Sequence, residues 1–97
     1  MAKYIVLLNW TDQGARTVKD TVQRARAARQ AFEALGVRMT DITWTLGQYD
    51  IVATLEAPDD ETVTRAGVAM AMQGNVRSTT LRGFTETEME QILKGLP

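Results

Sequence analysis

The chain has 97 residues, a length that suits one compact domain with a single hydrophobic core. Eleven basic and twelve acidic side chains leave a formal net charge of −1, which predicts no general attraction to nucleic acid or to an anionic membrane. Neither cysteine nor histidine occurs, which excludes disulfides, thiolate or imidazole metal ligands, cysteine nucleophiles and histidine bases. We therefore expect one domain over residues 1–97 with no metal and no other cofactor.

The longest aliphatic run covers only residues 5–8, far short of the roughly 20 residues that a membrane-spanning helix needs. The first residues also lack the charge and hydropathy pattern of a signal peptide. These two features predict a cytoplasmic protein that has no membrane partner.

Residues 3–9 predict a strand buried on both faces, because apolar side chains occupy both alternating sets. After a polar loop at residues 10–14, Thr17 is expected to cap a long helix, with Asp20 near the positive end of its dipole. Gly36 is placed to end this helix. The apolar stripe of the helix consists of Val18, Val22, Ala25, Phe32 and Leu35.

Residues 38–46 alternate between apolar and polar side chains, which predicts a second strand. Gly47 and Gln48 fit a two-residue turn, so a third strand is expected to begin at Tyr49. Counting back from the turn pairs Thr43 with Val52 and therefore sorts the side chains between two faces. One face receives Ile42, Trp44, Tyr49, Ile51, Ala53 and Leu55, and the other receives Asp41, Thr43, Thr45, Asp50, Val52 and Thr54.

The remaining elements are predicted mainly from residues that typically begin or end helices. Pro58 and the three acidic residues after it mark the start of a second helix, which is apolar on nearly all sides and ends at Gly74. Residues 75–82 predict a fourth strand, and the pattern leaves open which of its alternating sets faces the helices. Thr85 and Glu88 predict a capping box for a short final helix.

Two crossover units around one hairpin predict the ferredoxin-like α+β fold, a four-stranded antiparallel βαββαβ sheet with both helices on one face, followed here by a C-terminal helix. The first strand lies centrally in this topology and is apolar on both sides. A second copy of the chain is therefore expected to cover the open sheet face, which predicts a homodimer or a higher oligomer.

In this strand order, the hairpin sequence Leu46 to Asp50, which contains Gly-x-Tyr-Asp, resembles the GYD domain family. The resemblance covers nearly the whole chain and implies a dimeric α+β-barrel fold with an essentially uncharacterised function. The wider fold group includes cofactor-independent monooxygenases, lactone isomerases, haem enzymes and ligand-responsive regulators, so the fold alone does not decide the activity. Further support comes from Thr11-x-Gln13-Gly14, residues 57–60, residues 74–77 and residues 80–84.

Tyr49 and Asp50 are the candidate catalytic residues. In the functional interpretation they act at the mouth of a pocket as hydrogen-bond donor and general acid or base, and Thr45 holds the carboxylate across the hairpin. In the structural interpretation Gly47 supplies a positive φ angle, and Asp50 bonds Thr45 or a backbone amide. The sequence leaves both interpretations open.

Four further residues complete the set of candidate ligand-binding groups with Thr45. Trp44 is expected to line or adjoin the same site as the candidate catalytic pair, and Arg77 would form an anion-binding corner or an interfacial salt bridge if it faces Asp50. Thr11 and Gln13 precede a helix N-terminus that would bind an anion or a small polar ligand, or would simply cap the helix.

The leading hypothesis is a homo-oligomer that holds a small organic molecule between sheet and helices, with or without cofactor-independent catalysis. The alternative is a non-catalytic ligand-sensing or assembly module. An RNA-binding role is not expected, because polar residues follow Arg82-Gly83-Phe84 where the RNA-recognition signature has aromatic ones. Nor do Asp59, Asp60 and Glu61 predict a metal site, since their position is that of a helix cap.

Overall fold

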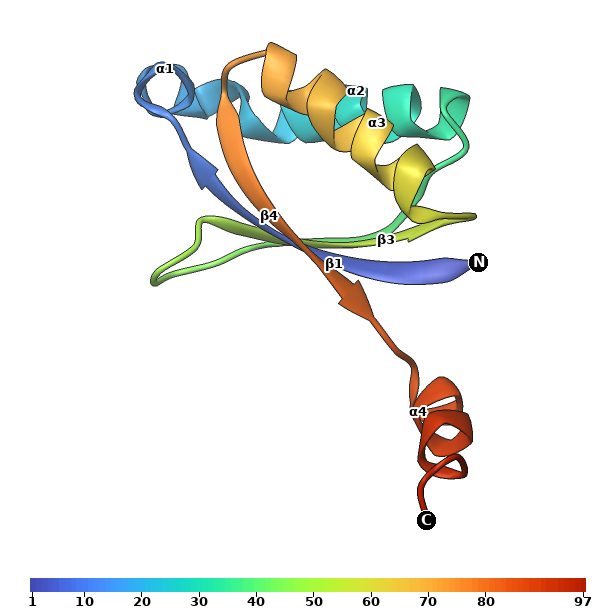
Figure 1. Ribbon diagram of the computed structural model, residues 1–97. Helices are drawn as coiled ribbons and strands as arrows, with labels where there is room; N and C mark the ends of the chain where they lie inside the picture. The colour runs from blue at the N-terminus through green and yellow to red at the C-terminus, as the bar shows by residue number, and fades with distance from the viewer.

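Four antiparallel strands form one sheet in the order β2-β3-β1-β4, and two helices cover one of its faces (Figure 1). The computed structural model describes all residues from Met1 to Pro97. The topology confirms the predicted ferredoxin-like α+β fold. The strands are β1 (Ala2–Trp10), β2 (Arg38–Trp44), β3 (Ile51–Ala57) and β4 (Val76–Gly83).

The first crossover is broken into three pieces, which corrects the prediction of one helix capped by Thr17. Thr11 is the true cap, and its side chain accepts a hydrogen bond from the Gly14 N–H at 3.1 Å. The hydroxyl of Thr17 makes no capping bond and donates to the Gln13 carbonyl oxygen at 3.3 Å instead. The pieces are α1 (Asp12–Arg16), the 3₁₀ helix η1 (Val18–Asp20) and α2 (Thr21–Ala34).

This break also changes the predicted apolar stripe. Val18 is half-buried, but Val22 is 44% exposed, and Phe32 is the one fully buried residue of α2. Because the chain passes from 3₁₀ to α geometry between Val18 and Val22, these side chains do not share one helical face. Much of the side of α2 that faces the sheet carries alanine.

The hairpin between β2 and β3 has the predicted register, with Thr43 opposite Val52 and Trp44 opposite Ile51. The connection is longer than predicted, since β3 begins at Ile51 and not at Tyr49. Residues 45–50 lie outside the ladder, although the Thr45 N–H still donates to the Asp50 carbonyl oxygen at 2.8 Å. Gly47 has φ +137°, the conformation that favours glycine.

The hydrophobic core lies between the sheet and the two helices. Within one chain β1 is fully buried on this side only, and its other side remains half-buried. The pairing of Ile5 with Leu81 and of Leu7 with Thr79 places alternate residues of β4 on the open face, which decides the orientation that the pattern left open. The core contains Tyr4, Val6, Leu8, Phe32, Val37, Ile51, Ala53, Leu55, Ala57, Val63 and Ala66.

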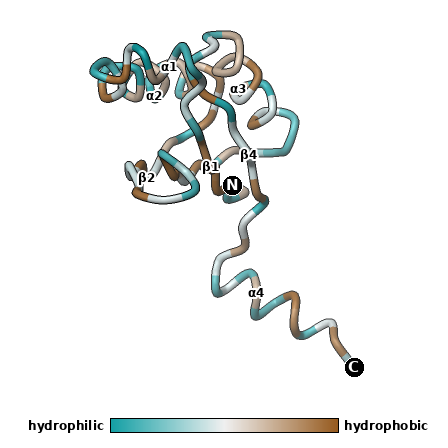
Figure 2. Tube along the Cα trace, turned by 90° about the vertical axis from the view of Figure 1, so that its left-hand side faces the viewer, coloured by the Kyte–Doolittle hydropathy of each residue, from teal (hydrophilic) through white to brown (hydrophobic).

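The remaining helices begin at the predicted signals. Asp59 caps α3 (Asp60–Met72) by accepting from the Thr62 N–H at 2.8 Å. Thr85 and Glu88 form the predicted capping box of α4 (Glu86–Leu93). Helix α4 projects away from the sheet and buries none of its residues (Figures 1 and 2). None of the helices has the length and hydropathy required to cross a membrane.

Candidate functional site

A cavity of about 320 Å³ lies between the helix-covered face of the sheet and the helices α2 and α3. Helix α2 packs over β2, while α3 packs over β3 and β4, so the two helices stand over different parts of the sheet. Fifteen of the nineteen residues that line the cavity are hydrophobic, which makes its body suited to an apolar group. The sheet contributes Val6, Leu8, Met39, Ile42, Ile51, Ala53, Leu55 and Val76.

Short side chains on α2 provide the space for this cavity. Four alanines of the helix line it, two of them half-buried and two exposed. On α3, Ala69 is the corresponding small residue, and Met70 lies beside it. The cavity volume follows from the sequence of α2, because the methyl group of alanine is too short to fill the space between the helix and the sheet that a branched aliphatic side chain would fill. The four alanines are Ala25, Ala27, Ala28 and Ala31.

One end of the cavity is polar, since its four polar lining residues come from the start of α2 and from the loop between α3 and β4. These two segments lie close to α1 in the structure (Figure 1). Thr21 accepts hydrogen bonds from both tryptophan indoles, at 3.3 Å from Trp10 and 3.1 Å from Trp44. The four residues are Thr21, Arg24, Gln73 and Asn75.

The predicted ligand-binding residues Thr11 and Gln13 do not line the cavity, but they hold the loop that does. The Thr11 hydroxyl donates to the Gly74 carbonyl oxygen at 2.6 Å, and its N–H donates to the Asn75 carbonyl oxygen at 3.0 Å. Gln13 Nε2 donates to the Gln73 carbonyl oxygen and to Asn75 Oδ1, both at 3.0 Å. Helix α1 therefore fixes the polar end of the cavity from outside.

None of the candidate residues of the β2–β3 hairpin lines the cavity. Of these, Trp44 adjoins the cavity through its hydrogen bond to Thr21, whereas Tyr49, Asp50 and Thr45 are absent from its lining. The Thr45 hydroxyl donates to the Tyr49 carbonyl oxygen at 2.5 Å and does not hold the Asp50 carboxylate.

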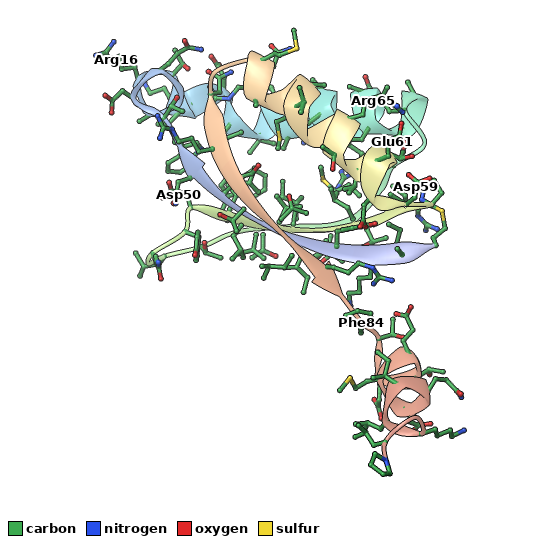
Figure 3. All side chains as sticks on the ribbon, viewed as in Figure 1. Arg16, Asp50, Asp59, Glu61, Arg65 and Phe84 are labelled. Atoms are coloured by element: carbon green, nitrogen blue, oxygen red, sulfur yellow. The ribbon has the colours of Figure 1, made fainter.

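Asp50 joins the hairpin to the end of β1 (Figure 3). Its carboxylate accepts from the Trp10 N–H at 3.0 Å, and its own N–H donates to the Leu8 carbonyl oxygen at 2.9 Å. Both bonds satisfy backbone groups where the β1–β3 ladder ends. This geometry matches the structural interpretation of Asp50, and a catalytic role of Tyr49 and Asp50 stays a prediction.

Arg77 forms no ion pair with Asp50. The residue stands opposite Asn9 in the β1–β4 ladder and therefore lies on the open face of the sheet, away from the cavity. The ion pairs of the chain are Arg65–Glu61 and Arg82–Glu88, both at exposed positions. Any molecule that Arg77 binds must therefore lie on the open face of the sheet and not in the cavity.

A second polar contact joins β1 to α3. The buried Tyr4 hydroxyl donates to Asp60 Oδ1 at 2.5 Å, and this bond to a carboxylate raises the pKa of Tyr4 above its ordinary value. Beside it, the hydrogen bonds from Thr62 lower the pKa of Asp59, in keeping with its role as the cap of α3. The chain contains no cluster of three or more groups arranged to hold a metal ion.

Sequence reasoning missed the residues that form the cavity. The sequence pattern places Ala25 on the apolar stripe of the first helix but gives no role to the other three alanines or to Arg24. A signal was present, because four alanines within seven residues leave that part of the helix without large apolar side chains. Only the packing of α2 against the sheet shows that the missing side chains correspond to empty volume.

The open antiparallel sheet, with its two helices and the apolar cavity beneath them, defines a ferredoxin-like α+β domain. The chain belongs to the GYD domain family, whose model matches residues 4–93. It is 36% identical over 95 residues to a protein from Thermus thermophilus named "Glutamine synthetase and cystathionine beta-lyase binding protein", a match that covers 97% of this chain and all of that protein.

Two solved structures share the fold. The crystal structure of MtbAldR matches with a TM-score of 0.68 and 16% identity, over 88% of this chain and 52% of that chain. This chain therefore spans about half the length of MtbAldR. The crystal structure of TTHA0845, also from Thermus thermophilus, matches with a TM-score of 0.56 and 22% identity, over 88% of this chain and 95% of that chain.

Proposed function

We propose that the chain is a homo-oligomeric binding module that takes up a small, mainly apolar molecule in the cavity between the sheet and helices α2 and α3. The cavity carries this proposal, because its volume of about 320 Å³ and its apolar lining are those of a small-molecule site. The location agrees with the hypothesis drawn from the sequence. The lining residues differ, since helix alanines replace the hairpin side chains.

The open sheet face supports the homo-oligomeric part of the proposal. Apolar side chains of three strands lie on it, and none of them is fully buried within one chain. An apolar sheet face of this kind is stabilised when a second surface covers it, and a second copy supplies a surface of the same shape and chemistry. These side chains are Ile5 and Leu7 of β1, Val52 of β3 and Leu81 of β4.

Enlarging one cavity alanine tests the binding proposal. Ala28→Leu places a branched chain in the cavity, so the affinity for the neutral apolar probe N-phenyl-1-naphthylamine is expected to fall by about tenfold or more. Ala34→Leu is the matched control, since Ala34 is exposed on the same helix and lies outside the cavity lining. Probe fluorescence measures both affinities. Equal binding by the two variants and the unchanged protein would contradict a site in this cavity.

A protein-binding role is the second candidate function, and helix α4 is the observation that favours it. Three of its apolar side chains, Met89, Ile92 and Leu93, are between 44% and 49% exposed. A helix with no fully buried residue gains stability when another surface covers its apolar side. The Thermus relative is named as a binding protein for two enzymes, which is consistent with such a role.

A single charge on α4 tests this second candidate. Ile92→Glu is expected to weaken binding to purified glutamine synthetase or cystathionine β-lyase by about tenfold or more, because the contact would bury an unpaired carboxylate. Glu90→Gln changes a side chain of the same helix without adding charge to its apolar side and serves as the control. Biolayer interferometry measures both variants. If Ile92→Glu binds both enzymes as tightly as the unchanged chain, α4 is not the contact surface.

A further inference from the structure

Arg24 is a cation at the polar end of an otherwise apolar cavity, and no carboxylate pairs with it. Its guanidinium donates to the Thr17 carbonyl oxygen at 2.9 Å, to the Thr17 hydroxyl at 2.8 Å and to the Gly14 carbonyl oxygen at 3.1 Å. Asp20 stands one helical turn earlier but makes no ion pair with it, since the ion pairs of the chain involve other residues. The positive charge of Arg24 is therefore held in place without being neutralised.

The fixed position of this guanidinium has a consequence for binding. A free arginine side chain loses rotamer entropy when it binds an anion, whereas the bonds to Thr17 and Gly14 have already ordered Arg24. A guanidinium has five N–H donors, and three hydrogen bonds occupy Arg24. Donors therefore remain for a further acceptor, and a charged acceptor forms the stronger bond.

Neutral donors lie at the same end of the cavity. Asn75 accepts a hydrogen bond from Gln13 at its Oδ1 atom, and its side-chain N–H groups have no partner within the chain. The side chain of Gln73 likewise has no hydrogen-bond partner within the chain. Both residues line the cavity, as Arg24 does. The polar end therefore combines one positive charge with two amide groups, opposite a body formed by alanines and sheet residues.

From this arrangement, and resting on the proposed binding function, we infer that the molecule held in the cavity is an amphipathic carboxylate. Its apolar body lies against α2 and the sheet, and its carboxylate accepts hydrogen bonds from Arg24 at the polar end. Such a ligand matches the cavity in two respects, because its charge is opposite to that of Arg24 and its polar and apolar parts lie against the polar and apolar parts of the lining. An apolar molecule without a charged head would leave the unpaired cation and the two amides unused, while an amphipathic cation would meet Arg24 as a like charge.

The test compares three eight-carbon molecules that differ only in the head group. Octanoate, octan-1-ol and octylamine compete with N-phenyl-1-naphthylamine at pH 8 and fixed ionic strength. Octanoate is expected to displace the probe at a concentration about tenfold lower than octan-1-ol, as a charge-assisted hydrogen bond predicts. Octylamine is expected to be the weakest competitor.

Substitutions at Arg24 connect this preference to the proposed residue. Arg24→Met is expected to remove the tenfold preference for octanoate over octan-1-ol, and Arg24→Lys is expected to retain part of this preference. Arg26→Met is the control, because Arg26 is exposed on the same helix and does not line the cavity. Circular dichroism and the melting temperature verify that each variant is folded.

The outcomes separate this inference from the proposed function. If octan-1-ol displaces the probe as well as octanoate does, or if Arg24→Met keeps the preference, the carboxylate inference is overturned while the apolar site stands. If octylamine competes best, the inferred charge of the ligand is wrong. If the probe does not bind the unchanged protein, the proposed function fails and the inference fails with it.

Discussion

Replacing Gly14 with alanine is expected to lower the free energy of unfolding by about 2–4 kcal/mol, a large effect for a single methyl group. A Cβ atom at this position would lie 2.0 Å from the carbonyl oxygen of Asn75, and no flexible side chain is available to move aside. The backbone of α1 would have to separate from the loop before β4. That movement would also strain the hydrogen bonds that Thr11 and Gln13 make to the loop.

Gly67→Ala is the matched control for this substitution. Gly67 lies within α3, and a Cβ atom there would meet nothing within 4 Å. The alanine is expected to stabilise the protein by about 0.5–1 kcal/mol, since glycine is the weaker helix former. Urea unfolding followed by circular dichroism measures both variants. A Gly14→Ala protein as stable as the unchanged chain would show that the contact between α1 and the loop is not tight.

Placing a carboxylate on the open sheet face is expected to weaken self-association by at least about 100-fold. Leu81→Asp suits this purpose, because Leu81 is 45% exposed within one chain and lies on the edge strand β4. The monomer therefore tolerates the new charge, whereas an interface that covers the face would bury it without a partner. Sedimentation velocity over a range of protein concentrations measures the association.

The control for Leu81→Asp is Val22→Asp. Val22 is exposed to nearly the same extent, but it lies on α2, on the helix-covered side of the molecule. Its replacement by aspartate adds the same charge and is expected to leave association unchanged. If Leu81→Asp and the unchanged chain sediment alike at every concentration, the open face is not the self-association surface.

Much of the fold could be predicted because its signals are local. The register of the β2–β3 hairpin followed from the alternation of residues 38–46 and from the position of Gly47, and the structure has the predicted pairs. The caps at Asp59 and Thr85 were equally predictable, since a capping side chain bonds a backbone group only three residues away. The family resemblance rested on the same hairpin and is confirmed by the match over residues 4–93.

The errors lie where distant segments meet. The sequence pattern from Thr11 to Asp20 predicts a loop and a helix start, whereas the segment forms α1 and η1, and Gly14 of α1 packs against Asn75. The third strand was predicted to begin at Tyr49, while Asp50 bonds the backbone of β1 and leaves the ladder to begin at Ile51. Neither contact has a signal within a few residues along the chain.

The sequence by itself determined the order of the four strands and of the two helices that cover the sheet, the hairpin register, the caps of α3 and α4 and the exclusion of histidine and cysteine chemistry. These features depend on the periodicity of side chains and on bonds between near neighbours, both of which a sequence displays directly. The tertiary structure decided the cavity, the place of Arg24 and the support that α1 gives to the polar end. These depend on volumes and hydrogen bonds between segments far apart in the chain, which exist only once α2, α3 and the loop before β4 pack together.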